Sequence, residues 1–502
     1  MVAQFLLHTD VFKKVLSSGE KTFSDILAKA RKGEIKLWIL PSTLIEAHRK
    51  MTLAEQNKLK EWLDVLKVVS ITSQESKDSI TAKNPELYLA EKAVTGFHLN
   101  AALTLDPLPQ EEWPMPFVSP SNLNDFLRNL KVKSVPLVSP PASYHQIWDD
   151  LETSLAEVIR PGRFILGAKV KELETKIAAY CQTNHAVGVS SGTDALLIAL
   201  MAGDIGPGDE VITTPYTFFA TVGSISRVGA TPVFADIEPD SFNISPNNIE
   251  SKITGKTKAI IPVHLYGQCA DMDSILDIAQ NKGLAVIEDA AQAIGAEYKF
   301  KRAGSFGNFG CFSFFPTKNL GGFGDGGIVT TSSDEAAEKL RLLRVHGSKI
   351  KYRHQIIGGN FRLDALQAAA VSAKLKYLET WSETRRQIAL NYCELFEKSG
   401  LSEKVSVPKE IFPRHIYNQF VIRVVGERDV LKEFLQTRGV STEIYYPLPL
   451  HMQECFASLG YKRGDFPESE KASAETLALP VSHEITQDQQ TFIVSAVADF
   501  FS

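Results

Sequence analysis

Between residues 186 and 289, short apolar runs alternate with stretches of helical spacing. The runs cover residues 186–189, 211–214, 231–236, 259–263 and 285–289. Continuous apolar runs of this kind are typical of strands buried on both faces of a parallel sheet, with helices covering those faces. The pattern therefore predicts an α/β domain built around a parallel sheet.

Candidate site residues fall at the ends of these expected strands. Gly192, Phe218, Asp289 and Lys318 each lie at or just after a strand end. In parallel α/β sheets the ligand binds at the carboxyl ends of the strands. None of the four residues indicates a binding site alone, but their common position at strand ends predicts one shared site.

Lys318 lies between an apolar run and a loop of residues 321–327, in which five of the seven residues are glycine. A lysine that forms a Schiff base reacts as the neutral amine, which a packed and partly dry site favours. A pyridine-type cofactor also needs an acid beside its ring nitrogen, and Asp289 could supply it. The glycines would let the backbone approach the cofactor closely. The competing interpretation is a solvated surface lysine beside an ordinary loop.

Two glycine-containing segments suggest phosphate binding. Gly322, Gly324 and Gly327 fit the G-x-G-x-x-G pattern, but residues 328–331 predict a strand where a dinucleotide site requires a helix. We therefore reject a dinucleotide site. Residues 186–200 predict a strand, a Ser-Gly-Thr turn and an apolar helix, whose free N–H groups could bind a phosphate. Serine and glycine also occur at such joints simply as helix caps.

The length of 502 residues predicts about three domains. With 44% hydrophobic and 23% charged residues the chain is globular, and its net charge of −5 offers no global attraction for nucleic acid or anionic membrane. Five scattered cysteines without a C-x-x-C pair indicate reduced thiols and no zinc site. The N-terminus lacks a charged signal-peptide region, and no apolar run approaches about 18 residues. We expect a cytoplasmic protein without membrane or nucleic-acid partners.

The N-terminal part of the chain is expected to form a separate unit. Residues 1–130 alternate strands and helices, which predicts a small α/β domain with a parallel sheet. The expected strands cover residues 5–7, 35–40, 65–71 and 100–106. Residues 131–141 carry Pro136, Pro140 and Pro141 and are expected to form a linker.

This first unit resembles a PIN-like domain, the fold of many small metal-dependent ribonucleases. The matching positions carry His8, Asp10, Glu46, Glu86 and Asp106. The family gathers carboxylates to hold Mg²⁺ or Mn²⁺, but His8 and Glu86 stand where it usually has Asp, and Asp10 where it often has Asn. The unit holds 16 basic and 16 acidic residues, without the basic excess typical of a nuclease. A degenerate scaffold and a live nuclease both remain open, and no metal site is predicted.

Residues from about 135 to 502 resemble sugar aminotransferases of the DegT/DnrJ/EryC1/StrS family. The matching motifs run in family order and comprise Gly167 and residues 191–196, 206–212, 215–221, 263–267, 288–292, 313–320, 324–327, 346–347, 359–364 and 446–447. The resemblance implies the fold type I architecture of aspartate aminotransferase. Its large domain, which binds pyridoxal phosphate (PLP), would cover residues 142–380, and a smaller α/β domain would cover residues 381–502.

The resemblance also implies how PLP is bound. Lys318 would hold it covalently and later act as general base and acid, as the second catalytic partner of Asp289. Asp289 would pair with the protonated ring nitrogen, and Gln292 would bond the ring 3-oxygen. Phe218 would stack on the ring face, although simple core packing is an equal alternative.

The phosphate of PLP would be held from two sides. The backbone amides of Gly192 and Thr193 and the hydroxyl of Ser313 would bind it within one chain. Asn360 matches the family asparagine that reaches the phosphate from a partner subunit. The resemblance therefore implies a homodimer with shared active sites.

The implied reaction transfers an amino group from L-glutamate to a nucleotide-linked keto-sugar. Residues 266–273 and 362–369 look most like members that aminate the 3-position. His264 and His346 could be structural or catalytic. Related dehydratases carry histidine in place of Lys318, so dehydration is disfavoured. A regulatory protein, or a bifunctional one whose first unit binds or cleaves RNA, is the alternative from another class.

Overall fold

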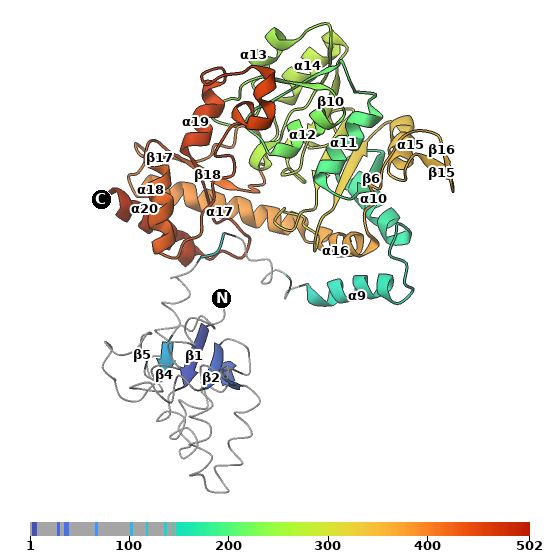
Figure 1. The fold of residues 1–502 in the computed structure, drawn as a ribbon. Coiled ribbons are helices and arrows are strands. Elements are labelled where there is room, and N and C mark those ends of the chain that lie inside the picture. The colour runs from blue at the N-terminus through green and yellow to red at the C-terminus, as the bar shows by residue number, and fades with distance from the viewer. Residues whose placement is uncertain are drawn as a thin grey trace, which may run out of the picture. The chain divides into compact units, whose positions relative to one another are not determined.

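The computed structural model describes residues 3–7, 28–30, 35–39, 66–68, 101–103, 117–118, 135–137, 144 and 147–502 (Figure 1). The chain divides into two units, Met1–Ser134 and Val135–Ser502. The linker expected at residues 131–141 spans the boundary between them. No helix among the described residues is both long and apolar enough to cross a membrane.

The first unit contains a five-stranded sheet. Its strands are β1 (Ala3–Leu7), β2 (Ile35–Ile39), β3 (Leu66–Val68), β4 (Ala101–Leu103) and β5 (Phe117–Val118), in the order β3-β2-β1-β4-β5. Every pairing is parallel, which confirms the parallel sheet expected here. The sequence does not predict β5, because it lies between Pro116 and Pro120, but an edge strand tolerates neighbouring prolines. The residues on which a nuclease interpretation depends lie outside the described residues: His8, Asp10, Glu46, Glu86 and Asp106.

A seven-stranded sheet forms the centre of the second unit. Its strands are β6 (His185–Val189), β7 (Glu210–Thr213), β8 (Thr231–Phe234), β9 (Thr257–Ile260), β10 (Ala285–Asp289), β13 (Phe309–Ser313) and β14 (Gly327–Thr331), in the order β6-β14-β13-β10-β9-β7-β8. The pairs from β13 to β8 are parallel, as expected. β14 departs from the expectation because it is antiparallel to both its neighbours. The loop before it contains no helix that would carry the chain back across the sheet, as a parallel connection requires.

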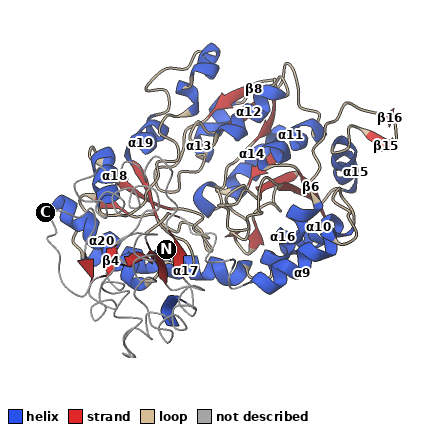
Figure 2. Cartoon of the chain, turned by 60° about the horizontal axis from the view of Figure 1, so that its bottom comes forward, coloured by secondary structure: helices blue, strands red, loops and turns tan. Residues whose placement is uncertain are grey.

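Helices cover both faces of this sheet (Figure 2). One face packs against α10 (Ala168–Tyr180), α14 (Met272–Lys282) and α16 (Ala365–Leu375), and the other against α11 (Gly192–Ala202), α12 (Phe219–Arg227) and α15 (Asp334–Leu343). Successive strand residues alternate between the two cores, as Val286 and Ile287 of β10 do. α9 (Trp148–Ile159) joins α16 through a hydrogen bond of 2.9 Å from Ser154 Oγ to the Ala369 carbonyl.

The C-terminal part has its own hydrophobic core. β17 (Val405–Ser406), β18 (Phe420–Val424) and β19 (Thr476–Leu479) form an antiparallel sheet, which packs with α17 (Leu378–Lys398), α18 (Arg428–Thr437) and α20 (Gln487–Phe501). Short helices α13 (Pro246–Ile249) and α19 (Pro467–Glu475) lie outside this core. The domain boundary expected between residues 380 and 381 falls inside α17, so this helix continues from one part into the other.

Candidate active site

The predicted site residues gather around the carboxyl ends of two neighbouring strands. Asp289 is the last residue of β10 and Ser313 the last residue of β13, and these strands are paired in parallel. Gly192 begins α11, and Phe218 immediately precedes α12. Parallel strands end at the same edge of a sheet, so the topology gives these residues a common location.

Asp289 is buried and held from two directions. One carboxylate oxygen accepts a hydrogen bond of 2.7 Å from Thr221 Oγ1, and the other accepts one of 3.2 Å from the Ala291 amide. Burial raises the pKa of Asp289, while these hydrogen bonds and the charge of Lys318 oppose the rise. A carboxylate that is buried and fixed by two hydrogen bonds is suited to share a proton with a basic ring nitrogen.

Lys318 lies in the turn that follows β13, where its amide donates to the Phe315 carbonyl at 2.9 Å. Desolvation lowers the pKa of its amine to about 8, against the opposing effect of the Asp289 carboxylate. A solvated surface lysine would keep its ordinary pKa near 10.4. The amine is therefore far more often neutral near pH 8 than an ordinary lysine, which suits a nucleophile and base.

The start of α11 approaches β13 so closely that only glycine fits. A Cβ on Gly192 would lie 2.7 Å from Ser313 Cβ. Ser191 caps the helix by accepting from the Asp194 amide at 3.0 Å. The N–H groups of Gly192 and Thr193 belong to the first turn and have no acceptor within the helix. With the Ser313 hydroxyl beside them, these donors fit a phosphate.

Phe218 is exposed over 62% of its surface, so the core-packing alternative is wrong. α12 carries Thr221 one turn later, and the Thr221 amide donates to the Phe218 carbonyl at 3.2 Å. Phe218 at the N-cap of α12 thus presents an open aromatic face, and Thr221 in the first turn presents the hydroxyl that fixes Asp289. A planar ring of a ligand could stack on Phe218 and place a ring nitrogen beside the Asp289 carboxylate that Thr221 orients.

Gln292 is buried, and its amide already has two protein partners. Its Oε1 accepts from the Tyr266 amide at 2.7 Å, and its Nε2 donates to the Tyr446 hydroxyl at 2.9 Å. An amide nitrogen has two donors, so one N–H of Gln292 is left for a further acceptor such as a ring oxygen.

The two histidines differ in their surroundings. His264 is fully buried; its Nδ1 accepts from the Ala270 amide at 3.1 Å, and its Nε2 therefore donates to Glu288 at 2.9 Å. Glu288 also accepts from three backbone amides at 2.7 Å, those of Gly304, Phe306 and Gly307. With both ring nitrogens engaged by protein, His264 fits the structural role. His346 is exposed and belongs to a different segment.

Asn360 follows a hairpin formed by β15 (Ser348–Ile350) and β16 (Arg353–His354). It is exposed, and its backbone bridges to Val345. Its side chain makes no hydrogen bond to another described residue. The structure therefore does not join it to the other candidate residues within one chain, and its role in a partner's site stays a prediction.

The sequence assigns no role to Thr221 or Tyr446, although both lie in motifs that carry the resemblance. Thr221 could have been found from its place one helical turn after Phe218. Tyr446 could not, because it is separated from Gln292 by 154 residues.

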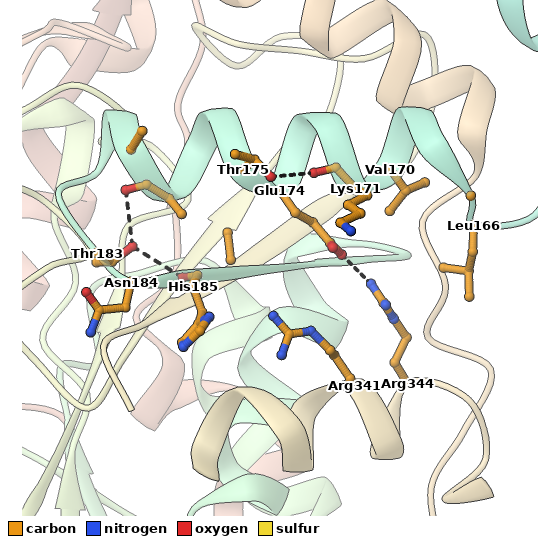
Figure 3. Close-up of a pocket in the computed structure, with 14 residues that line it drawn as sticks. Leu166, Val170, Lys171, Glu174, Thr175, Thr183, Asn184, His185, Arg341 and Arg344 are labelled. Atoms are coloured by element: carbon orange, nitrogen blue, oxygen red, sulfur yellow. Dashed lines mark hydrogen bonds and ion pairs between the residues drawn. The ribbon is translucent and has the colours of Figure 1, made fainter. Parts of the chain in front are cut away.

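A cavity of about 570 Å³ lies elsewhere in the second unit (Figure 3). Residues of α10, β6 and α15 line it, and it contains none of the candidate site residues. Across it, Glu174 accepts from Arg344 at 2.5 Å, as Figure 3 shows. Glu174 also accepts from the Gly188 amide at 2.9 Å. Glu174 and Arg344 thus bind the backbone N–H and C=O of Gly188 in β6, which gives this pair a structural role.

Comparison with known proteins concerns the second unit. A profile of the DegT/DnrJ/EryC1/StrS aminotransferase family matches residues 146–498. The chain is 52% identical over 369 residues to the pleiotropic regulatory protein of Geobacillus stearothermophilus, covering 73% of this chain and 99% of that protein. It is 39% identical over 367 residues to dTDP-3-amino-3,4,6-trideoxy-alpha-D-glucose transaminase of Streptomyces venezuelae, covering 73% and 96%. The crystal structure of NtdA from Bacillus subtilis with bound cofactor PMP matches with a TM-score of 0.69 at 32% identity, covering 73% of this chain and 85% of that one.

Proposed function

Because the chain belongs to the DegT/DnrJ/EryC1/StrS family and is a PLP-dependent aminotransferase, we propose that it transfers the amino group of L-glutamate to carbon 3 of a nucleotide-linked keto-sugar. Relatives named as nucleotide-sugar 3-aminotransferases support this class of substrate. The observation that carries the chemistry is the mutual electrostatic influence of two groups: Asp289, buried at the end of β10, and Lys318, in the turn that follows the adjacent strand β13.

The residues around these two groups fit PLP. Gly192, Thr193 and Ser313 would hold its phosphate, where the close approach of α11 to β13 leaves no space for a side chain at residue 192. Phe218 would cover one face of its ring, and Gln292 would donate its free N–H to the ring 3-oxygen. When bound, PLP supplies a ring that accepts the electron pair released as a bond at the donor's α-carbon breaks.

Asp289 and Lys318 divide the proton handling between them. The Asp289 carboxylate, oriented by Thr221, holds the proton at the ring nitrogen. The neutral amine of Lys318 takes the proton from the α-carbon of L-glutamate as a general base. In the second half of the reaction it delivers a proton to the sugar carbon that receives the amino group.

We propose that the protein is a homodimer in which Asn360 completes the phosphate site of the partner subunit. The exposure of Asn360 and the lack of a hydrogen-bond partner for its side chain among the described residues support this role. No activity is proposed for the first unit, because the residues on which a nuclease interpretation depends lie outside the described residues.

The first test is the visible absorbance of the full-length protein loaded with PLP, before and after addition of L-glutamate. We expect a band that depends on Lys318 and that L-glutamate abolishes, as the amino group moves to the cofactor. Lys318→Ala should lack the band, whereas Lys301→Ala, an exposed lysine variant, should keep it. A band that does not respond to L-glutamate would refute the donor, and a band retained in Lys318→Ala would refute the role of Lys318.

A further inference from the structure

Two chain segments cross at close range beside the active site. The Ile416 amide donates to the Gly267 carbonyl, and the Asn418 amide to the Tyr266 carbonyl, each at 2.9 Å. A Cβ on Gly267 would lie 2.8 Å from Ile416 Cγ1 and 3.0 Å from the Asn418 nitrogen. Gly267 also has a φ of 101°, so both space and backbone conformation require glycine at this crossing.

Both segments carry a tyrosine in the left-handed region. The φ of Tyr266 is 58° and that of Tyr417 is 45°. Bulky residues rarely adopt this conformation, and they keep it only where the surrounding structure determines it strongly. Both side chains are buried, so packing and the two backbone bonds fix this geometry together.

The residue next to Lys318 is tied to the same crossing. Asn319 Nδ2 donates to the Ile416 carbonyl at 3.2 Å, and Asn319 Oδ1 accepts from Asn418 Nδ2 at 2.7 Å. Both asparagine residues are only 7% exposed. Because buried hydrogen bonds in a dry environment are costly to break, they restrict the position of residue 319.

The crossing is also hydrogen-bonded to Gln292, another residue of the candidate site. The Tyr266 carbonyl accepts from Asn418, while the Tyr266 amide donates to Gln292 Oε1 at 2.7 Å. A continuous set of hydrogen bonds therefore leads from Asn319 through Asn418 and Tyr266 to Gln292. Through this set, the Lys318 turn and Gln292 are both attached to segment 416–418.

We propose that Asn319 is a positioning residue for Lys318, which acts by anchoring the Lys318 turn to segment 416–418 through Ile416 and Asn418. The anchor holds the partly buried Lys318 side chain in fixed register with Gln292 and limits the access of water to its amine. The inference rests on the proposed role of Lys318. An absorbance measurement distinguishes a failure of the anchor from a failure of that role.

The test uses full-length protein loaded with PLP and measures the pH midpoint of its Lys318-dependent absorbance band. Asn319→Ser and Asn418→Ala should each raise the midpoint by about one pH unit, because water reaching the lysine nitrogen stabilises its protonated form. The double variant should shift it no further than the larger single change, because both substitutions break one anchor. Asn418→Ala keeps the backbone bonds of the crossing, so it also tests the side-chain contact if Asn319→Ser folds poorly.

Gln490→Ala is the matched control. Gln490 is a buried amide in α20 that donates to the Ile388 carbonyl at 3.0 Å, and it has no hydrogen bond to Lys318 or to the crossing. We expect it to lower the thermal unfolding temperature without moving the midpoint. A midpoint unchanged in both Asn418→Ala and Asn319→Ser, or moved equally by Gln490→Ala, would overturn the inference. Absence of any lysine-dependent band in the wild type would instead overturn the proposed function.

Discussion

Burial and the Asp289 carboxylate act in opposite directions on Lys318. Burial lowers the pKa of the Lys318 amine, the carboxylate raises it, and burial is the larger effect, which leaves the pKa at about 8. Asp289 experiences the reverse, because burial raises its pKa while the charge of Lys318 lowers it. Each group therefore stabilises the charged form of the other in a site that disfavours any isolated charge.

Asp289→Asn should lower both the rate of transamination and the pKa of Lys318. The amide can still accept from Thr221, but the charge that raises the lysine pKa is lost while burial remains. The pKa of Lys318 should fall below about 8, so the acid limb of the pH–rate profile should move to lower pH. We expect a loss of about 100-fold in rate, because the ring nitrogen loses its anionic partner. An unchanged rate and pH profile would contradict the role of Asp289.

Thr221→Val should weaken PLP binding by about tenfold, the effect of losing one hydrogen bond to a charged group. Valine keeps the shape of threonine but removes the donor that orients Asp289 and helps to lower its pKa. Thr331→Val is the control, because Thr331 is also buried and donates to the Asn308 carbonyl at 2.8 Å, but it lies outside the site. Titration with PLP, followed by absorbance, compares the affinities of the two variants. Equal affinities of Thr221→Val and Thr331→Val for PLP would show that the Thr221 contact is unimportant for binding.

The sequence predicts the sheet and the main candidate residues because both leave local signals. Apolar runs mark the strands, and Asp289 stands at the end of one of them. Side-chain contacts between distant residues leave no such signal: Thr221 and Asp289 are 68 residues apart, and Asn319 and Asn418 are 99 apart. The role of Phe218 cannot be read from the sequence for another reason: an apolar residue can stack on a ligand or join a core. Only its exposure in the structure distinguishes these two roles.

Gly192→Ala should weaken binding of PLP more than binding of pyridoxal, which lacks the phosphate. The added Cβ would lie 2.7 Å from Ser313 Cβ and would push the first turn of α11 away from β13. We expect the affinity for PLP to fall by about tenfold or more, because the backbone donors lose their alignment. Gly206→Ala is the control, because its Cβ would find its nearest neighbour at 3.7 Å. An equal loss for both ligands would place the phosphate elsewhere.

Mixed subunits test whether Asn360 serves the partner's site. Homodimers of Lys318→Ala and of Asn360→Ala should each have low activity, because every site lacks one of the two groups. In a dimer with one subunit of each kind, one site combines Lys318 from one chain with Asn360 from the other, and the second site lacks both. Mixing and reassembling the two variants should therefore restore activity, up to half of the wild-type value per mixed dimer. If Asn360 served its own chain, each site of the mixed dimer would still lack one group, and steady-state assays would detect no recovery.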